Sequence, residues 1–371
     1  MNRLIIIGNG FDIAHGLQTR FSDFINYYLN NVWKKLHAIG EYNNENDPLI
    51  KVTNALRFFK ENDFKYDINN PYITFKKIYH PGNSFQEGHA RLIINSTYFT
   101  EIFENYISGN WFDIETEYYN ELIRIIEYEE RMFTHNIDRT STQKLKLSKI
   151  LNLNKALSFI EENLLAHLKN EQERFIKNPI YSEYILDCFY ENIYYQESEK
   201  SEKKDYSLVP EKILIVNFNY TTVARRYTRS NTEYIHIHGS LFDEPIFGFG
   251  DDTSDKYKEL ENEYNNEFLR KIKSFKYLKN SNYKKLLTFI NSGDFQVHIY
   301  GHSCGVSDRT LFKQIFENSG CKHIKPFYYD EKDFDEKMFE ISRHFSNKID
   351  FLTKVVPFED CRRMPQPKEL K

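Results

Sequence analysis

Short runs of uninterrupted apolar residues predict the strands of this 371-residue chain. Leu4–Ile7 ends at a glycine and Ile213–Val216 ends at an asparagine, and neither run shows the alternation of a half-exposed strand. Such runs are typical of strands that are buried on both faces, as in parallel sheets covered by helices. Further strands are predicted at residues 234–240, 246–250, 297–300 and 324–330.

Apolar positions at helical spacing fill the intervals between these runs. They predict helices at about 16–33, over 257–290, after the strand at 297–300, and at 332–346. The alternation of strands and helices predicts an α/β fold, a three-layer Rossmann-like and mostly parallel sheet. Ligands of such sheets bind at the carboxyl ends of the strands, where this chain has polar or glycine-rich residues.

The stretch 40–207 has a different pattern, with long helical segments such as 111–130 and 153–176. Its second half is poor in glycine, which favours long helices over tight turns. Residues 196–207 are charged and poor in apolar residues, as in an exposed linker. We therefore predict an α/β core at 1–39 and 208–371 and an inserted, mainly α-helical lobe at 40–207.

Composition narrows the class of function. Lys and Arg number 50 against 54 Asp and Glu, a net charge of −4, which argues against binding nucleic acid or anionic membrane by bulk charge. Cys188, Cys304, Cys321 and Cys361 form no CxxC pair, so neither a metal site nor a disulfide framework is expected. No apolar run has the length of a signal peptide or a membrane span, so we expect a cytoplasmic protein.

Three polar segments at predicted strand ends form the candidate site. Gly8, Asn9 and Gly10 follow the first strand, and such a loop suits an anion because its backbone admits close approach. On this reading, Gly10→Val should abolish nucleotide binding and leave the fold largely intact. A tight strand-to-helix turn without a ligand explains the glycines equally well.

The second and third segments are 217–221 and 301–303. Asn217 and Asn219 bring two carboxamides to the same sheet edge, and a helix cap accounts for one of them. Gly301, His302 and Ser303 form the third segment. Asp308, shortly beyond, is interpreted as a group that stabilises the start of a helix.

His236 and His238 lie on one face if residues 234–240 form a continuous strand. A metal site is disfavoured because no cysteine or suitably spaced carboxylate accompanies them. His238 adjoins Gly239 at the carboxyl end of the strand, where a ligand can reach it. We therefore predict His238 as a catalytic acid or base and His236 as a structural or substrate-facing residue.

Four separated motifs, in order, resemble the AbiH family of bacterial phage abortive-infection proteins. They are IIIGNGFDIAHGL, ILIVNFNYT, YIHIHGSL with IFGFG, and VHIYGHSCGVSDRTLF, and WFDIETE at 111–117 adds to them. That family is itself similar to sirtuins and to sirtuin-like NADases of bacterial defence. The resemblance implies an anti-phage protein with a sirtuin-like fold.

Sirtuin motifs match this sequence residue by residue. Gly8, Gly10 and Gly16 have the spacing of the sirtuin glycine loop, and Asn217 and Asn219 match two positions of the T-x-N-x-D segment. His238 matches the catalytic histidine that precedes a glycine, and 301–303 match the ribose-binding GTS. Asp12 and Gln18 depart from the sirtuin serine and proline, and the four-cysteine zinc module is missing. The resemblance therefore implies NAD binding or hydrolysis instead of protein deacetylation.

This resemblance implies an NAD glycohydrolase, with NAD as substrate and without a metal. His238 and Asn217 are the implied catalytic residues. The implied NAD-binding residues are Gly8, Asn9, Gly10, Phe11, Asp12, Gly16, Asn219, Gly239, Gly301, His302 and Ser303. Asp12, Asp113 and Glu115 are candidates for stabilising the cationic ribose, and for the last two a solvated carboxylate is an equal explanation.

Two other functions stay open at this point. The same loop and ribose contacts suit a nucleotide-binding sensor that regulates a partner without turnover. The third candidate function is a nuclease acting on RNA or DNA. The slight excess of acidic residues in the chain disfavours it. The expected partners are NAD or a related nucleotide, a phage-derived or host protein that triggers activity, and a second copy of the chain.

Overall fold

The computed structural model describes residues 1–39, 41–43, 45–53, 66–79, 90–110, 112–133, 139–195, 209–263 and 265–370. The chain forms two compact units. The first consists of Met1–Thr19, Leu168–Ser254 and Ile272–Lys371, and the second of Arg20–His167 and Asp255–Lys271. The predicted linker 196–207 lies outside the described residues.

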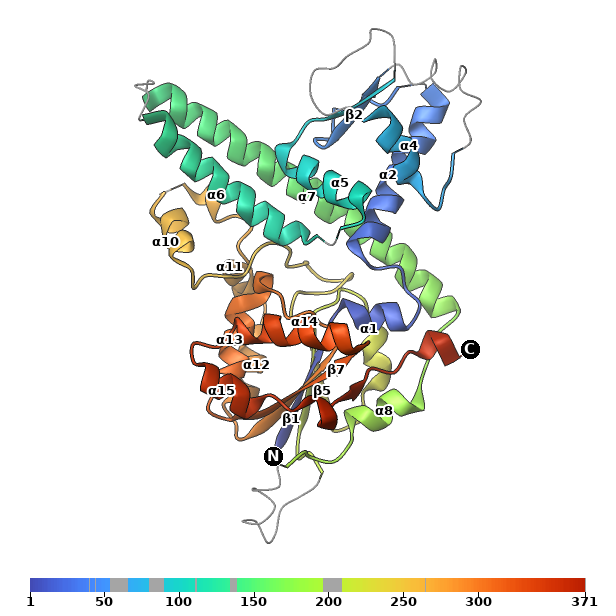
Figure 1. Cartoon of the computed structure of the whole chain (residues 1–371), viewed down its shortest axis with the longest axis vertical. Helices are drawn as coiled ribbons and strands as arrows, with labels where there is room; N and C mark the ends of the chain where they lie inside the picture. Colours follow the sequence, from blue (N-terminus) through green and yellow to red (C-terminus); the bar gives the residue numbers. More distant parts are fainter. Residues whose placement is uncertain are drawn as a thin grey trace. The chain divides into compact units, whose positions relative to one another are not determined.

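The first unit is built on a six-stranded sheet in which every pair of neighbours is parallel (Figure 1). Its strands are β1 (Asn2–Ile7), β4 (Ile213–Asn217), β5 (Thr232–His236), β6 (Phe295–Tyr300), β7 (Cys321–Tyr328) and β8 (Arg362–Arg363). Their order is β5-β4-β1-β6-β7-β8, so successive strands run outward from β1 in one direction and then, from β6, in the other. This is the 3-2-1-4-5-6 order of dinucleotide-binding sheets. The predicted α/β fold with a mostly parallel sheet is confirmed.

Helices cover both faces of this sheet. Leu4 and Ile6 of β1 belong to one apolar cluster, together with residues of α12 (Asn282–Ile290), α13 (Arg309–Phe316) and α14 (Glu331–Ser342). Ile5 and Ile7 belong to the cluster on the opposite face, together with α1 (Asn9–Ala14), α8 (Glu183–Phe189) and the 3₁₀ helix η1 (Val223–Tyr227). Because both faces are buried, β1 needs apolar side chains at successive positions.

Short helical elements complete the first unit. They are α11 (Lys273–Lys276), η3 (Tyr277–Lys279), η4 (Val306–Asp308), α15 (Lys348–Lys354), η5 (Phe358–Asp360) and η6 (Pro367–Leu370). The end of α7 (Arg139–Lys177) also belongs to this unit.

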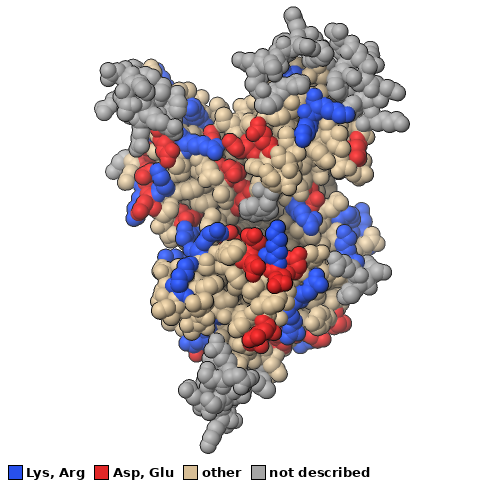
Figure 2. Space-filling model, in the orientation of Figure 1, with Lys and Arg blue, Asp and Glu red and all other residues tan. Residues whose placement is uncertain are grey.

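The second unit is mainly helical. It contains α2 (Phe21–Ile39), α4 (Pro71–Ile78), α5 (Thr97–Ser108), α6 (Ile114–Phe133), α10 (Asp255–Asn262), η2 (Asn266–Phe268), most of α7, and the antiparallel strands β2 (Ile50–Thr53) and β3 (Arg91–Ile94). The helix predicted at 153–176 is confirmed as part of α7, and the one predicted at 111–130 is confirmed from Ile114 onward as part of α6. On the visible face of each unit, basic and acidic side chains are interspersed (Figure 2).

Three local predictions are wrong. The segment 246–250 is a loop held by a hydrogen bond from the amide of Gly250 to the carbonyl of Ser307, 2.9 Å long. The first helix begins at Asn9, and the chain then turns through Gly16, whose φ is +87°, before α2 starts at Phe21. Strand β5 ends at His236, because the next residues form a turn that leads into Gly239, whose φ is +75°.

Candidate functional site

The carboxyl ends of β1, β4 and β6 bring the three predicted polar segments into direct contact. The amide of Gly10 donates to the carbonyl of Gly301 at 2.7 Å, and Nδ2 of Asn219 donates to the carbonyl of Gly8 at 3.0 Å. The contact between the tips of β1 and β6 lies where the strand order of the sheet reverses. In open α/β sheets, this switch point is where ligands bind.

Glycines at these tips allow backbone to pack against backbone. A Cβ at Gly8 would lie 2.5 Å from the Cα of His302, and one at Gly10 would lie 2.8 Å from the Cα of Gly301. Gly301 itself has a φ of +66°, and its Cβ would lie 2.2 Å from the amide nitrogen of Phe11. The expectation that Gly10→Val leaves the fold intact is therefore wrong, because the valine side chain would collide with the Gly301 backbone.

The predicted ligand-binding residues differ in their access to solvent. Asn9 and Ser303, on the tips of β1 and β6, are exposed, and Asn219 is half-buried. Phe11 is fully buried among core side chains of the α1 and α8 layer, and Gly16 supplies a left-handed turn after α1. Asn9 and Ser303 are thus the side chains of the β1 and β6 tips that a bound molecule can reach.

Asn217 is buried, with 1% of its surface exposed, and its carboxamide is bonded within the protein. Its Nδ2 donates to the carbonyl of Thr221 at 2.9 Å and to the hydroxyl of Tyr234 at 2.7 Å. Its Oδ1 accepts from the amide of Asn219 at 3.0 Å. Asn217 therefore fixes the turn that presents Asn219 to the β1 tip.

Asp12 links the tips of β1 and β4 from beneath. It is 1% exposed and accepts hydrogen bonds from Nδ2 of Asn219, at 2.9 Å, and from the hydroxyl of Thr221. Burial raises the pKa of Asp12 to about 7, although both hydrogen bonds act in the opposite direction. The folded protein thus favours the protonated acid up to neutral pH.

This raised pKa predicts a pH-dependent stability that Asp12→Asn removes. Stabilisation by the protonated acid is complete below the ordinary value of 3.8 and is lost as pH rises through the folded-state pKa of about 7. The full loss corresponds to about 4 kcal/mol. Asparagine resembles the protonated acid, so the melting temperature of Asp12→Asn should exceed that of the wild type increasingly from about pH 5 to about pH 8. Calorimetry that finds a constant gap over this range contradicts the assignment.

His236 and His238 lie in different surroundings, so the expectation that they share one face is wrong. Nδ1 of His236, on the last residue of β5, is 3.0 Å from the carbonyl oxygen of Asn219. His238 lies beyond the strand, with its ring edge-on to Phe218 and its Nε2 3.2 Å from the hydroxyl of Tyr277. The turn before Gly239 breaks the two-residue period that would have kept the two rings together.

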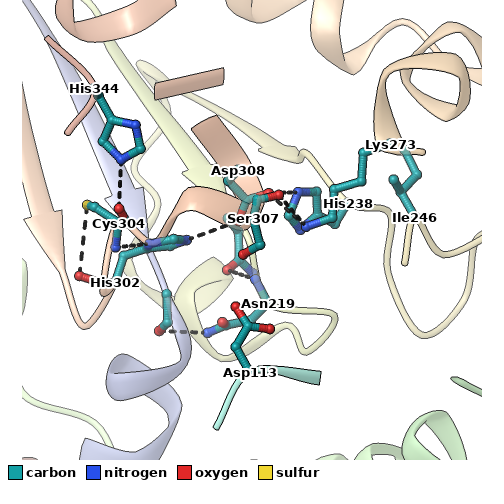
Figure 3. Close-up of polar contacts among 12 residues, drawn as sticks. Asp113, Asn219, His238, Ile246, Lys273, His302, Cys304, Ser307, Asp308 and His344 are labelled. Carbon is teal, nitrogen blue, oxygen red and sulfur yellow. Dashed lines mark hydrogen bonds and ion pairs between the residues drawn. The ribbon is translucent and has the colours of Figure 1, made fainter. Parts of the chain in front are cut away.

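A buried carboxylate, Asp308, lies between Lys273 and two histidines (Figure 3). Its Oδ1 is 2.8 Å from Nζ of Lys273 and 3.1 Å from Nε2 of His238. Its Oδ2 is 4.0 Å from Nε2 of His302. Asp308 precedes α13 but its side chain makes no capping hydrogen bond, so its interpretation as a helix-stabilising group is wrong.

The charges in this cluster follow from burial and pairing. Burial alone would raise the pKa of Asp308, but the Lys273 ammonium and the nearby imidazoles hold it well below its usual range. The pKa of His238 is lowered, first by burial and then by the charge of Lys273, while Asp308 acts in the opposite direction. The cluster is thus a carboxylate–ammonium pair beside a neutral imidazole.

His302 supports the β6 tip from inside. The amide of Cys304 donates to its Nδ1 at 2.9 Å, so in the neutral ring Nε2 carries the hydrogen and faces Asp308. Burial lowers the pKa of His302 to about 3. Cys304 has a φ of +59°, which L-residues rarely adopt, and its carbonyl accepts from Nε2 of His344 at 2.7 Å. These bonds hold the backbone of the tip in one conformation.

Two of the predicted acidic residues, Asp113 and Glu115, belong to the second unit. Oδ1 of Asp113 accepts from the amides of Glu115, at 2.9 Å, and Thr116, at 3.3 Å, at the start of α6. This is the geometry of a helix-capping residue. Asp113 therefore has a local structural role at that helix.

Sequence reasoning missed Lys273 and Tyr277. Both lie in a segment predicted only as helical, and no motif distinguishes Lys273 from its neighbours Lys271 and Lys276. Asp308 carried a usable signal, because it follows the β6 tip within the same short loop.

Within the described residues, no three or more His, Cys, Asp or Glu side chains are grouped as metal ligands. The four cysteines are buried free thiols. Among the helices that the structure describes, none combines the length and the apolar character needed to cross a membrane.

Comparison with known proteins identifies the family. The family described as bacteriophage abortive infection AbiH matches residues 4–330. This range includes β1 from Leu4 onward, the strands β4, β5, β6 and β7, and every polar tip described above. No curated protein and no solved structure matches the chain. Because the match spans most of its length, the chain belongs to the AbiH family of abortive-infection proteins, which act in anti-phage defence.

Proposed function

We propose that this chain binds NAD at the carboxyl edge of its sheet and cleaves the bond between nicotinamide and ribose. One observation carries the proposal: the sheet has the strand order of dinucleotide-binding folds, and the polar tips of β1 and β6 meet at its switch point. The buried contact between Asp308, which follows β6, and His238, which follows β5, adds a group that can exchange a proton near the same edge.

Binding would use the exposed side chains at the switch point. Asn9 and Ser303 follow the two strands between which the strand order reverses, and both can hydrogen-bond hydroxyl or phosphate oxygens of a dinucleotide. Asn217, Asp12 and His302 support these tips from within. The glycines let the tips approach each other closely.

The proposed cleavage needs little covalent chemistry from the protein. Water oxygen bonds to C1′ of the ribose as the C1′–nitrogen bond breaks, and the electron pair of that bond neutralises the positive nicotinamide ring. The water proton passes to His238. The products are nicotinamide and ADP-ribose. Because the ribose carries positive charge in the transition state, the protein contributes to the rate mainly by positioning NAD and the attacking water.

His238 suits the role of proton acceptor because its lowered pKa leaves it neutral at pH 7. Loss of NAD would stop the metabolism of an infected cell, which is the outcome that an abortive-infection protein serves. The same proposal includes a phage-derived or host protein that triggers the activity. It also includes the assembly of several copies of the chain.

Calorimetric titration of the full chain with NAD and with ADP-ribose tests the binding step. Ser303→Ala removes one exposed hydroxyl, so NAD affinity should fall by about two- to tenfold without loss of stability. Ser319→Ala, at an exposed position just before the amino end of β7, is the matched control and should bind as the wild type does. Absence of NAD binding to the wild type, or equal affinities of both variants, would count against this site.

A further inference from the structure

Lys273 is a completely buried lysine whose ammonium pairs with the buried carboxylate of Asp308. It opens the short helix α11, and its Nζ lies 2.8 Å from Oδ1 of Asp308 and 3.3 Å from the carbonyl oxygen of Ser307. Burying an ammonium is unfavourable unless an anion is buried beside it. A solvent-exposed lysine does not carry this cost. The burial of Lys273 therefore needs a physical explanation.

The oxygen that binds Lys273 is also the oxygen nearest to His238. Nε2 of His238 is 3.1 Å from the same Oδ1, so the two nitrogens lie within about 6 Å of each other. Figure 3 shows both side chains approaching Asp308 from the same side, with His302 on the other. The titratable and charged groups that face His238 are Asp308, Lys273, Tyr277 and His302.

We propose that Lys273 is a positioning residue: by pairing with Asp308 it keeps the His238 imidazole neutral and therefore able to accept a proton. One carboxylate can balance one positive charge in a buried site. When Lys273 supplies that charge, a protonated His238 would be a second cation in the cluster and is disfavoured. Without Lys273, the Asp308 anion would draw a proton onto His238 instead.

The Asp308–His238 contact alone would have the opposite effect. A buried carboxylate beside an imidazole stabilises imidazolium, which cannot act as a base. The distances to Lys273 and His238 show that this carboxylate is already shared. Lys273 thereby sets the pH range in which the site works, and this kinetic consequence rests on the proposed function.

The test is the titration of His238 in the full-length protein, followed by NMR of labelled histidine. The His238 signal is assigned by its absence in His238→Asn. In Lys273→Met, the titration midpoint of His238 should rise by about one pH unit or more. Lys279→Met, which removes an exposed lysine paired with Glu244, is the matched control and should leave the midpoint unchanged.

An unchanged midpoint in a folded Lys273→Met protein overturns the inference. If Lys273→Met does not fold, Lys273→Gln takes its place, with the same rise expected and an unchanged midpoint again overturning the inference. A wild-type midpoint above the ordinary 6.5 overturns the inference in either case. These measurements need no NAD, so they stand even if the proposed NAD cleavage fails. If NAD is cleaved, the activity lost in Lys273→Met should return as pH is raised, which a merely structural defect would not allow.

Discussion

Replacing His238 with alanine should lower the rate of NAD cleavage by about 10²–10⁴-fold while NAD binding persists. The reason is that the proposed reaction passes the water proton to this imidazole, which lies beside Asp308 at 3.1 Å and is neutral at pH 7. The exposed binding side chains Asn9 and Ser303 are untouched by the change. The measurement is turnover at saturating NAD, with calorimetric affinity determined on the same preparation.

His236→Ala is the informative comparison for this variant. His236 ends β5, and its Nδ1 contacts the carbonyl oxygen of Asn219 instead of the Asp308 cluster. His236→Ala should reduce turnover by less than about tenfold, because the variant loses a local contact but keeps the proposed proton acceptor, His238. Comparable turnover by His238→Ala and the wild type would falsify the catalytic assignment.

Gly301→Ala should destabilise the first unit by about 3–5 kcal/mol, because backbone strain and a backbone collision add at this position. A left-handed backbone alone costs an L-residue about 1–2 kcal/mol. At Gly301 the added Cβ would also lie 2.2 Å from the amide nitrogen of Phe11 and 2.5 Å from the carbonyl carbon of Gly10. Relief of this collision requires the β1 and β6 tips to separate.

Gly109→Ala separates the two causes. Gly109 has a φ of +71°, close to the +66° of Gly301, but nothing lies within 4 Å of its added Cβ. This variant should therefore show the backbone cost of about 1–2 kcal/mol alone. Chemical denaturation of both variants measures the difference, and equal destabilisation would show that the contact between the tips is not tight.

The sheet was predictable because its strands are buried on both faces. Leu4–Ile7 and Ile213–Val216 are apolar at every position, and the structure places successive side chains of β1 in opposite apolar clusters. That the segments at Gly10 and Gly301 lie at one edge of the sheet followed from the same argument, since parallel strands end at one edge, and their direct contact is a finding of the structure.

The polar cluster was less predictable because it depends on backbone angles and on distant segments. Whether His236 and His238 share a face is decided by the turn that leads into Gly239, where the sequence alone allowed a continued strand. Lys273 reaches Asp308 from a helix that no local pattern connects to the β6 tip. Such long-range pairing leaves no periodic signal in the sequence.

The glycines illustrate how one sequence pattern can have two explanations. Gly8 and Gly10 fit a phosphate-binding loop, yet their amides donate to the carbonyls of Tyr300 and Gly301. Their lack of a side chain is explained by the packing of the β6 tip against them. The closeness of the two tips is what brings Asn9 and Ser303 to the same edge of the sheet.

Release of nicotinamide from NAD by the purified full-length chain tests the central claim most directly. Chromatography should show nicotinamide and ADP-ribose appearing in equal amounts as NAD disappears, with His238→Ala run beside the wild type. A wild-type preparation that binds NAD with calorimetric heat but releases no nicotinamide would contradict cleavage and favour a nucleotide sensor. If the wild type neither binds nor cleaves NAD, the proposed function is wrong.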